Sequence, residues 1–356
     1  MTALLDYRSN RIVELLQEPA ERRDAEWLRQ ALQQAVLLEL ATLPPYLCGL
    51  WSIEDPSRDE GVFTAIREVV FDEMSHLGLA CNLLTTIGGV PRLADEKVVP
   101  KYPGPLPGGV RPDLTVFLSG LTKDSLDMYS SIEEPDHPVA HLGTHTSIGA
   151  FYDAVLEAFR SRPDLITGAH QVTRNMQQHG QGNSIVALTS LADVEAAIGV
   201  IKEQGEGTSA SPRNPHPGEQ EELAHFYVFR EIFHGRKLVK TADDPVRWEF
   251  VGDTIPMPVC RPMATVPSGG WGAGGTAAPD AETRELLDSV NHAYSELLRF
   301  LEAAWQADAP AKAKEFLNKA IGQMFALQGP AQTLMERPLP QGGGSTYGPE
   351  FRYVAP

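Results

Sequence analysis

Two short motifs pair a glutamate with a histidine three positions later. Glu73 and His76 occur in "FDEMSHL", and Glu222 and His225 occur in "EELAHFYVF". Residues three apart lie on one face of a helix, one turn from each other. A carboxylate and an imidazole in this arrangement can bind one metal ion together, although they can also form a simple ion pair. The residues around the motifs favour the metal.

Both motifs lie on apolar stripes and not on solvated faces. With about 100° between successive residues, several apolar side chains fall within roughly 40° of Glu73: Ile66, Leu77, Ala80 and Leu84. The side chains equally close to Glu222 are Phe226, Phe229 and Phe233. A third acid, Glu39, shares a stripe with Leu32, Ala35, Val36, Leu43 and Tyr46, without a basic residue. Burial of an unpaired carboxylate costs several kcal/mol, so a shared metal site explains all three acids.

The order of these residues predicts a dinuclear site. A four-helix bundle holds two metal ions with a Glu from each of two helices and Glu-x-x-His from each of the other two. We therefore expect Glu39, Glu73, His76, Glu222 and His225 to be metal ligands. Carboxylate and imidazole donors suit two iron ions, Fe²⁺ or Fe³⁺, with manganese as the alternative. Glu73 is also expected to act in catalysis, and Tyr46 is a candidate catalytic tyrosine because of its position on the Glu39 stripe.

The bundle pattern requires one more acid, on the helix that precedes Glu222, and two residues are candidates. Glu203 lies four residues before the loop 207–217, and Glu222 lies five residues after it. In an antiparallel hairpin, residues equally far from the turn lie at the same level, which favours Glu203. Glu157 lies farther away along the chain. We expect it to be exposed, or to contact a metal-binding residue without binding the metal itself.

The elements that must position these residues are predicted to be helices. Helical patterns cover 25–43, 60–87, 147–160, 190–205, 218–236, 281–306 and 310–328. Pro44 and Pro45 are expected to kink or end the first helix. Residues 89–145 are rich in Pro and Gly and predict a long crossover with one short strand at "LTVFL". We expect one all-α domain, with a metal-binding bundle in residues 1–250 and a loop and two helices packed on it in residues 251–356.

The composition limits which partners and which cellular compartment are expected for this chain. The 356 residues include 30 Lys and Arg and 47 Asp and Glu, a formal charge of −17. This balance argues against nucleic acid and anionic membranes as partners. No signal peptide and no run of eighteen apolar residues is apparent, and three scattered cysteines do not form a disulfide framework. The expected location is the cytoplasm, and the expected partners are dioxygen and a small molecule, with a homo-oligomer left open.

The chain resembles the ferritin-like domain shared with the iminophenyl-pyruvate dimer synthases of violacein- and rebeccamycin-type pathways. The resemblance rests on "ELATLPPYL", "EVVFDEMSHLGLACNLLTTIGGVP", "KYPGPLPGGV", "SIGAFYDAV", "AAIGVIKEQGEG", "ELAHFYVFREI" and "GPEF", which together span nearly the whole chain. It implies a ferritin-like four-helix bundle with a non-haem metal site, often in bacterial secondary metabolism. Where the family often has "IGEFY", this chain has Ala150, which weighs against a ligand from that helix.

The sequence therefore predicts a non-haem di-iron oxidase or oxygenase that activates dioxygen or peroxide. Its expected substrate is a small organic molecule, derived from an amino acid, in natural product biosynthesis. The resemblance offers an imine-coupling or oxidative dimer synthase as one alternative. A non-catalytic ferritin-like iron-binding protein is the other.

Overall fold

The computed structural model describes residues 6–135, 148–176, 184–208, 211–214, 222–273, 278–340 and 343–356, and most of them are helical. The helices are α1 (Arg11–Gln17), α2 (Ala25–Ser52), α3 (Glu60–Thr86), α4 (Lys123–Ile132), α5 (Ile148–Ser161), α6 (Leu191–Glu206), α7 (His225–His234), α8 (Ala281–Gln306) and α9 (Pro310–Leu334). The strands are β1 (Arg236–Asp243) and β2 (Val246–Thr254). Short 3-10 turns occupy Ala20–Arg22, Pro107–Gly109 and Pro163–Leu165. This is the all-α architecture that the sequence predicts.

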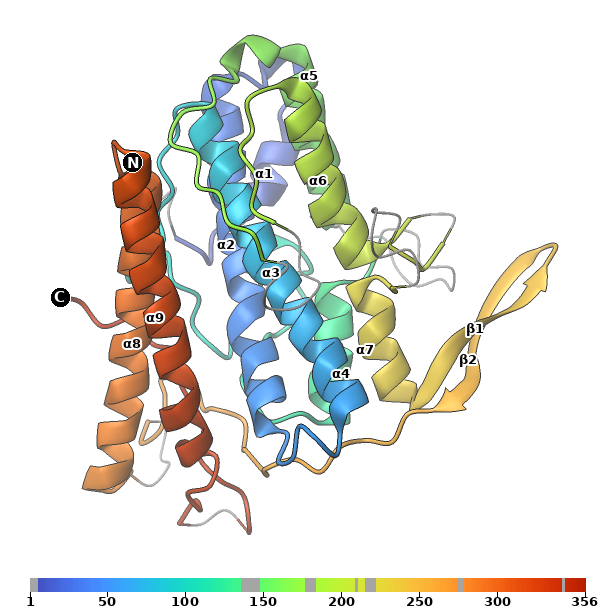
Figure 1. Cartoon of the computed structure of the whole chain (residues 1–356), viewed down its shortest axis with the longest axis vertical. Helices are drawn as coiled ribbons and strands as arrows, with labels where there is room; N and C mark the ends of the chain where they lie inside the picture. Colours follow the sequence, from blue (N-terminus) through green and yellow to red (C-terminus); the bar gives the residue numbers. More distant parts are fainter. Residues whose placement is uncertain are drawn as a thin grey trace.

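Helices α2 and α3 form the central pair of the bundle (Figure 1). α2 begins after Asp24, whose side chain accepts hydrogen bonds from the backbone N–H groups of Glu26 and Trp27. By length and composition α2 could cross a membrane, but its most apolar stretch is completely buried inside the protein. Its apolar character therefore reflects its place in the core.

The sequence predicts that the two prolines of α2 kink or end the helix, and they do not end it. The helix continues through Pro44 and Pro45 for two further turns. Pro45 has no N–H group, so the carbonyl of Ala41 loses its usual helical partner. The hydroxyl of Tyr102 donates a hydrogen bond to that carbonyl over 2.8 Å. A side chain from the crossover thus replaces the missing helical bond.

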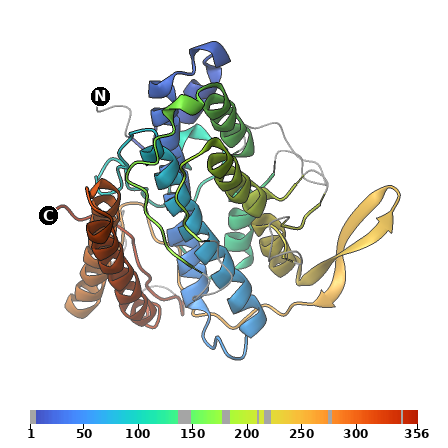
Figure 2. The ribbon, with the colours of Figure 1, turned by 45° about the horizontal axis from the view of Figure 1, so that its top comes forward.

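The other two helices of the bundle are each divided into two shorter helices. α5 packs beside α6, and α4 packs beside α7, so that α7 continues the line of α6 (Figures 1 and 2). The N–H of Gly149, at the start of α5, donates to Glu206 at the end of α6 over 2.8 Å. The end of α4 meets the start of α7 through Glu133 and His225. All four helix ends therefore lie close to one level of the bundle.

The crossover contains a buried helix where the sequence predicts irregular structure. α4 begins with a capping box in which Thr122 and Ser125 exchange side-chain and backbone hydrogen bonds. Its Tyr129 is completely buried and lies edge-on to Tyr46, with 4.8 Å between ring centroids. The predicted strand at "LTVFL" is reduced to a single bridge that involves Val116.

The helix predicted around Glu222 and His225 differs from the one observed. α6 agrees with the predicted helix 190–205, but α7 begins only at His225. Glu222 precedes that helix, and its carbonyl accepts a hydrogen bond from the N–H of Asn214 over 2.9 Å. The backbone there is held in extended pairing, so Glu222 and His225 do not share a helical turn. Residues 218–221 of the predicted helix lie outside the described part of the chain.

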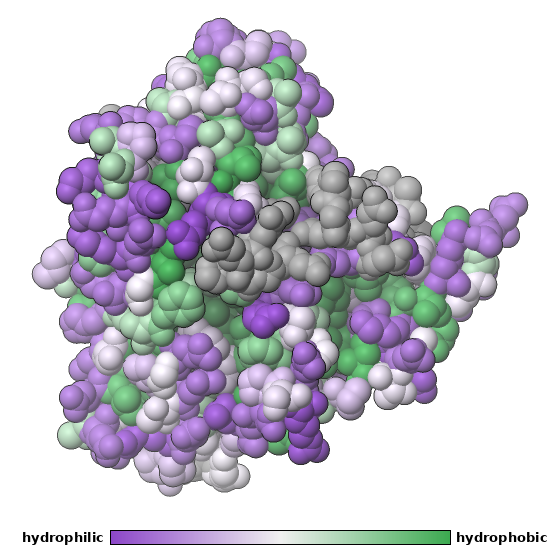
Figure 3. Space-filling model, in the orientation of Figure 1, coloured by the Kyte–Doolittle hydropathy of each residue, from purple (hydrophilic) through white to green (hydrophobic). Residues whose placement is uncertain are grey.

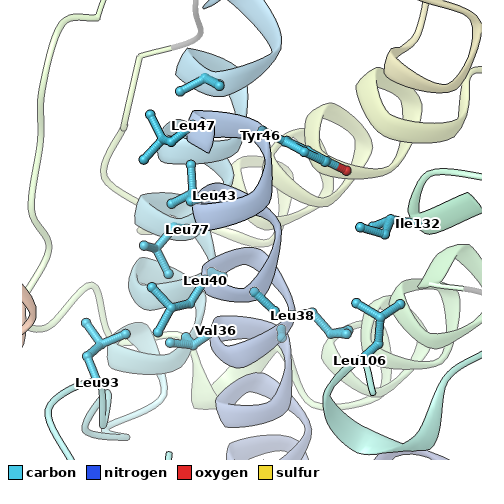
Figure 4. Packing of buried hydrophobic residues seen from close by; sticks show 14 of the residues in the cluster. Val36, Leu38, Leu40, Leu43, Tyr46, Leu47, Leu77, Leu93, Leu106 and Ile132 are labelled. Carbon is cyan, nitrogen blue, oxygen red and sulfur yellow. The ribbon is translucent and has the colours of Figure 1, made fainter. Parts of the chain in front are cut away.

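Two further elements surround the bundle. β1 and β2 form an antiparallel hairpin in a stretch where no strand is predicted, and it projects from the end of α7 (Figure 1). α8 and α9 pack together along the outer side of α2 and α3, and α9 extends beyond its predicted end to Leu334. Figure 4 shows that Leu40, Leu43 and Leu47 point to one side of α2, whereas Tyr46 points to the other, toward Ile132. α2 therefore separates two different environments.

Candidate metal centre

Five buried side chains form two overlapping clusters inside the bundle. Glu39, Glu73 and His76 form the first, and Glu73, Glu133 and His225 form the second. Within each cluster, the possible ligand atoms lie within 4.8 Å of one another. None of the five residues is more than 6% exposed. Glu73 belongs to both clusters, which is the position of an acid that bridges two metal ions.

The two histidines present the same ring nitrogen to Glu73. Nδ1 of His76 lies 3.4 Å from Glu73 Oε1, and Nδ1 of His225 lies 2.9 Å from the same oxygen. The other nitrogen of His76 is 2.8 Å from Gln204 Oε1, and that of His225 is 3.3 Å from Asp72 Oδ2. Metal-bound histidines commonly donate their second nitrogen to an oxygen that fixes the ring orientation. Gln204 and Asp72 offer such an oxygen to His76 and His225.

Each of the three acids has a hydroxyl donor on one carboxylate oxygen. Tyr152 donates to Glu39 Oε1 over 2.5 Å, and Thr42 donates to Glu73 Oε2 over 2.8 Å. Tyr46 donates to Glu133 Oε1 over 2.5 Å. These bonds fix the orientation of each carboxylate, and no described hydroxyl group donates to its second oxygen. Tyr46, a candidate catalytic residue from the sequence, is therefore a positioning residue for Glu133 in this geometry.

The donor set fits a pair of transition-metal ions. Nδ1 of His225 is buried and has no hydrogen-bond partner within the described part of the chain, although Glu73 Oε1 is only 2.9 Å away. Two ligand atoms about 2.1 Å from one ion and about 90° apart lie about 3 Å from each other. Three carboxylates with two imidazoles are the donors that iron and manganese accept. The orphaned nitrogen and the donor types both support metal binding.

Burial holds protons on two of the acids when no metal is bound. Burial and the neighbouring Glu73 carboxylate raise the pKa of Glu39 to about 8. The same two causes raise the pKa of Glu133 to about 7. Burial also raises the pKa of Glu73, but the imidazoles of His225 and His76 outweigh it, so its pKa lies below the usual range. Glu73 is thus the ionised acid at the centre of the site.

The two histidines also favour their protonated forms, but here the cause is contact with carboxylates and not burial. Burial lowers the pKa of His76, but contact with Glu73 outweighs it and raises the pKa to about 9. For His225 too, burial is outweighed, here by its contacts with Asp72 and Glu73, and its pKa rises well above the usual value. Metal ligands must be deprotonated, so metal binding releases these protons.

The metal-free protein is expected to lose stability as the pH rises from 6 to 9. The pKa of Glu39 rises from 4.5 in the unfolded chain to about 8 in the folded chain, and that of His76 from 6.5 to about 9. Each group therefore binds its proton more tightly when folded, and that stabilisation is lost as the pH rises through the folded pKa. Thermal unfolding of the metal-free protein should show a midpoint several °C lower at pH 9 than at pH 6 (about 2 °C per kcal/mol for a large domain).

The double variant Glu39→Gln, Glu133→Gln provides the control for this pH dependence. It removes two of the responsible groups, so its midpoint should change less over the same range. Loading with metal should also flatten the dependence, because bound ligands no longer carry protons. An unfolding midpoint that rises toward pH 9 in the metal-free protein would contradict the raised pKa values of Glu39 and His76.

A small cavity of about 30 Å³ lies against the clusters. Its lining residues come from α2, α3, the end of α4 and the junction of α5 and α6, and they include Glu39, Glu73, His76, Glu133 and Glu206. A water molecule needs about 10–15 Å³ by this measure, so the cavity has room for a molecule the size of dioxygen. Gly149 permits this junction, because a Cβ at that position would lie 2.4 Å from a carboxylate oxygen of Glu206.

The structure brings together four of the ligands expected from the sequence, namely Glu39, Glu73, His76 and His225. Neither cluster includes Glu222 or Glu203. Because α7 continues the line of α6, these two acids do not face each other across an antiparallel hairpin, and the reason for preferring Glu203 is wrong.

Glu157 lies on the surface and pairs with Arg23 over 3.3 Å, with 66% of the Glu157 side chain exposed. This agrees with the expectation that Glu157 is an exposed acid. Ala150 lies on α5, which contributes the hydroxyl of Tyr152 to the site and no carboxylate to either cluster.

Glu133 is not among the ligands that the sequence predicts. This acid follows α4, inside the stretch predicted to be an irregular crossover. A signal was present, because Leu126 and Tyr129 fall within roughly 40° of Glu133 on a helix and give it an apolar stripe, as Glu39 and Glu73 have. Gln204 and Asp72 carried no comparable signal, because their roles depend on which histidine nitrogen they meet.

Comparisons with known proteins agree with this architecture. A family described as Ferritin-like matches residues 32–234, which is more than half of the chain. A ferritin-like protein from Caulobacter vibrioides has a similar solved structure, with a TM-score of 0.60 and 20% sequence identity over 92% of this chain and 97% of that chain. No curated protein matches the sequence. At this identity the structural similarity establishes the fold alone.

Proposed function

The chain belongs to the ferritin-like family, and from this premise we propose that it is a non-haem dinuclear metal oxidoreductase. The observation that carries the proposal is the pair of buried clusters that share Glu73. Glu39 and His76 would hold one ion, Glu133 and His225 would hold the other, and Glu73 would bridge them. Iron is the proposed metal, with manganese as the alternative. A bound pair of this kind supplies electrons to dioxygen or peroxide.

The protein's own residues would orient and protect this chemistry. Tyr152, Thr42 and Tyr46 hold one oxygen of each acid, so that the second oxygen is available to an ion. Glu39 and Glu133 would release their protons when metal binds, since both pKa values lie near neutrality. The cavity beside these acids has the size of the small oxidant and not of an organic molecule.

The proposed substrate is a small organic molecule derived from an amino acid, in bacterial secondary metabolism. This part of the proposal rests on the resemblance of the quoted motifs to the iminophenyl-pyruvate dimer synthases, and imine coupling is one such reaction. Dioxygen and this substrate are the proposed partners.

The test is dioxygen consumption by the protein loaded anaerobically with ferrous iron. We expect rapid uptake that scales with bound iron, together with an iron content that stays at about two per chain. A non-catalytic storage protein would instead accumulate iron well beyond that ratio. Protein that binds two ferrous ions and leaves dioxygen untouched, with or without peroxide, would contradict the proposed oxidoreductase.

A further inference from the structure

The hairpin of β1 and β2 projects away from the helices (Figures 1 and 2). It is attached at the end of α7, where the ring of Phe250 stacks on the ring of His234 with 4.4 Å between centroids. Within the described part of the chain this sheet has two strands only, so each strand has one edge without a backbone partner. A two-stranded hairpin is marginally stable in water, and further strands stabilise it. The open edges are therefore candidate sites for another strand.

The second strand of the hairpin exposes apolar side chains. Val246 is 49% exposed and Val251 is 59% exposed. Figure 3 shows hydrophobic and hydrophilic side chains next to one another on this projecting arm. An edge strand with exposed apolar side chains is a template for pairing with another chain.

Two charged residues of β2 meet no opposite charge within the hairpin. Arg247 lies opposite Ala242, and Glu249 lies opposite Val239. Both charged residues are exposed. The ion pairs that the hairpin makes within the described chain involve other residues. Arg247 and Glu249 are therefore available to a partner on the open edge of β2.

The sequence of β2 is complementary to itself when two copies pair in antiparallel. The complementary stretch is "VRWEF", residues 246–250. Pairing about Trp248 places Arg247 of each copy opposite Glu249 of the other. It also places Val246 opposite Phe250. Side chains directly opposite each other are about 4.5–5.5 Å apart, and pairs of opposite charge and pairs of aromatic with β-branched residues both stabilise a sheet.

The other strand, β1, lacks this complementarity. It carries three basic residues, Arg236, Lys237 and Lys240, and one acid, Asp243. Two copies of β1 side by side would bring mainly like charges together, which destabilises strand pairing. The distribution of charge therefore selects the edge of β2 as the site of contact.

We propose that the chain forms a two-fold symmetric dimer through the β2 edges of two hairpins. The hairpins would join into one antiparallel sheet of four strands, in which Arg247 pairs with Glu249 at two places. In such a strand addition the main-chain hydrogen bonds supply affinity and the side chains supply specificity. The contact is smaller than an obligate interface, so the dimer is expected to dissociate on dilution.

The proposal can be tested by sedimentation equilibrium of the metal-loaded, full-length protein over a range of concentrations. The unchanged protein should form dimers. Arg247→Glu places acid opposite acid across the contact, and Glu249→Arg places base opposite base. Each variant alone should therefore dimerise at least about ten-fold more weakly. Arg160→Glu is the matched control and should keep the dimer, since Arg160 lies on the surface of α5 and pairs with Glu195.

An equimolar mixture of the two hairpin variants distinguishes pairing of β2 from damage to the hairpin. In a mixed dimer, each introduced charge meets its opposite, so the mixture should recover the dimer that the separate variants lose. A damaged hairpin would not be rescued in this way. The proposal is overturned if the unchanged protein is monomeric at every concentration, if either variant dimerises with full affinity, or if the mixture remains monomeric.

Failure of this proposal is distinguishable from failure of the proposed function. The 10 residues of α7, about 15 Å of helix, separate the hairpin from His225 at the start of α7. Bound iron and dioxygen uptake should therefore be the same in Arg247→Glu as in the unchanged protein. A protein that dimerises as described and binds no metal would support the β2 contact and contradict the oxidoreductase.

Discussion

Replacement of Glu73 by alanine is expected to leave the protein almost free of metal. Glu73 Oε1 is the atom that both imidazoles face, and Glu73 is the one acid that belongs to both clusters. Loss of a residue that merely orients a metal ligand costs about 10–100-fold in metal affinity, so loss of the bridging ligand should cost more. Elemental analysis after expression with added iron should fall from about two ions per chain to nearly none.

Two controls accompany this measurement. Circular dichroism should show that Glu73→Ala keeps its helices, because the other walls of the site remain. Glu157→Gln changes an exposed acid outside the site, and it should retain both ions. A Glu73→Ala protein that keeps two ions and continues to consume dioxygen would exclude the dinuclear centre.

Replacement of Glu133 by glutamine is expected to remove about one ion per chain. Glu133 contributes to the cluster with His225 and not to the cluster with His76. Glutamine is close in size and can still accept the hydrogen bond from Tyr46, but it lacks the negative charge that a metal ion requires. Anaerobic titration with ferrous iron should then show one tight site in place of two.

Glu203→Gln is the matched comparison, since Glu203 is the acid that sequence connectivity favours and lies outside both clusters. We expect this variant to retain both ions. If Glu203→Gln lost an ion and Glu133→Gln did not, the ligand assignment from the structure would be wrong, and the assignment from the sequence would stand.

Several features of the site could be predicted because helical periodicity is a local property. The apolar stripes around Glu39 and Glu73 indicated that these acids are buried, and the spacing of Glu73 and His76 placed both on one face of α3. The residue types indicated iron or manganese before any distance was known. Helical bounds agreed where capping residues mark the ends, as Ser190 does at the start of α6.

Other features depended on contacts between segments far apart in the chain. The sequence marks Pro45 as a helix breaker, but the Tyr102 hydroxyl supplies the hydrogen bond that lets α2 continue. Glu222 has the spacing of a ligand, yet backbone pairing with Asn214 keeps it out of α7. Periodicity within one segment of sequence does not reveal that Tyr102 or Asn214 makes these contacts.

The sequence by itself therefore determined the helical class, the burial of Glu39 and Glu73 and the types of the donor groups, because each follows from residue type and spacing within one helix. Only the tertiary structure decided that Glu133 joins Glu73 and His225. The end of α4 meets the start of α7 because two of the bundle's helices are each divided into two shorter ones, whose ends lie at one level. Residues more than a hundred positions apart meet only when whole helices pack, and that packing is decided by the complementary shapes of many side chains at once.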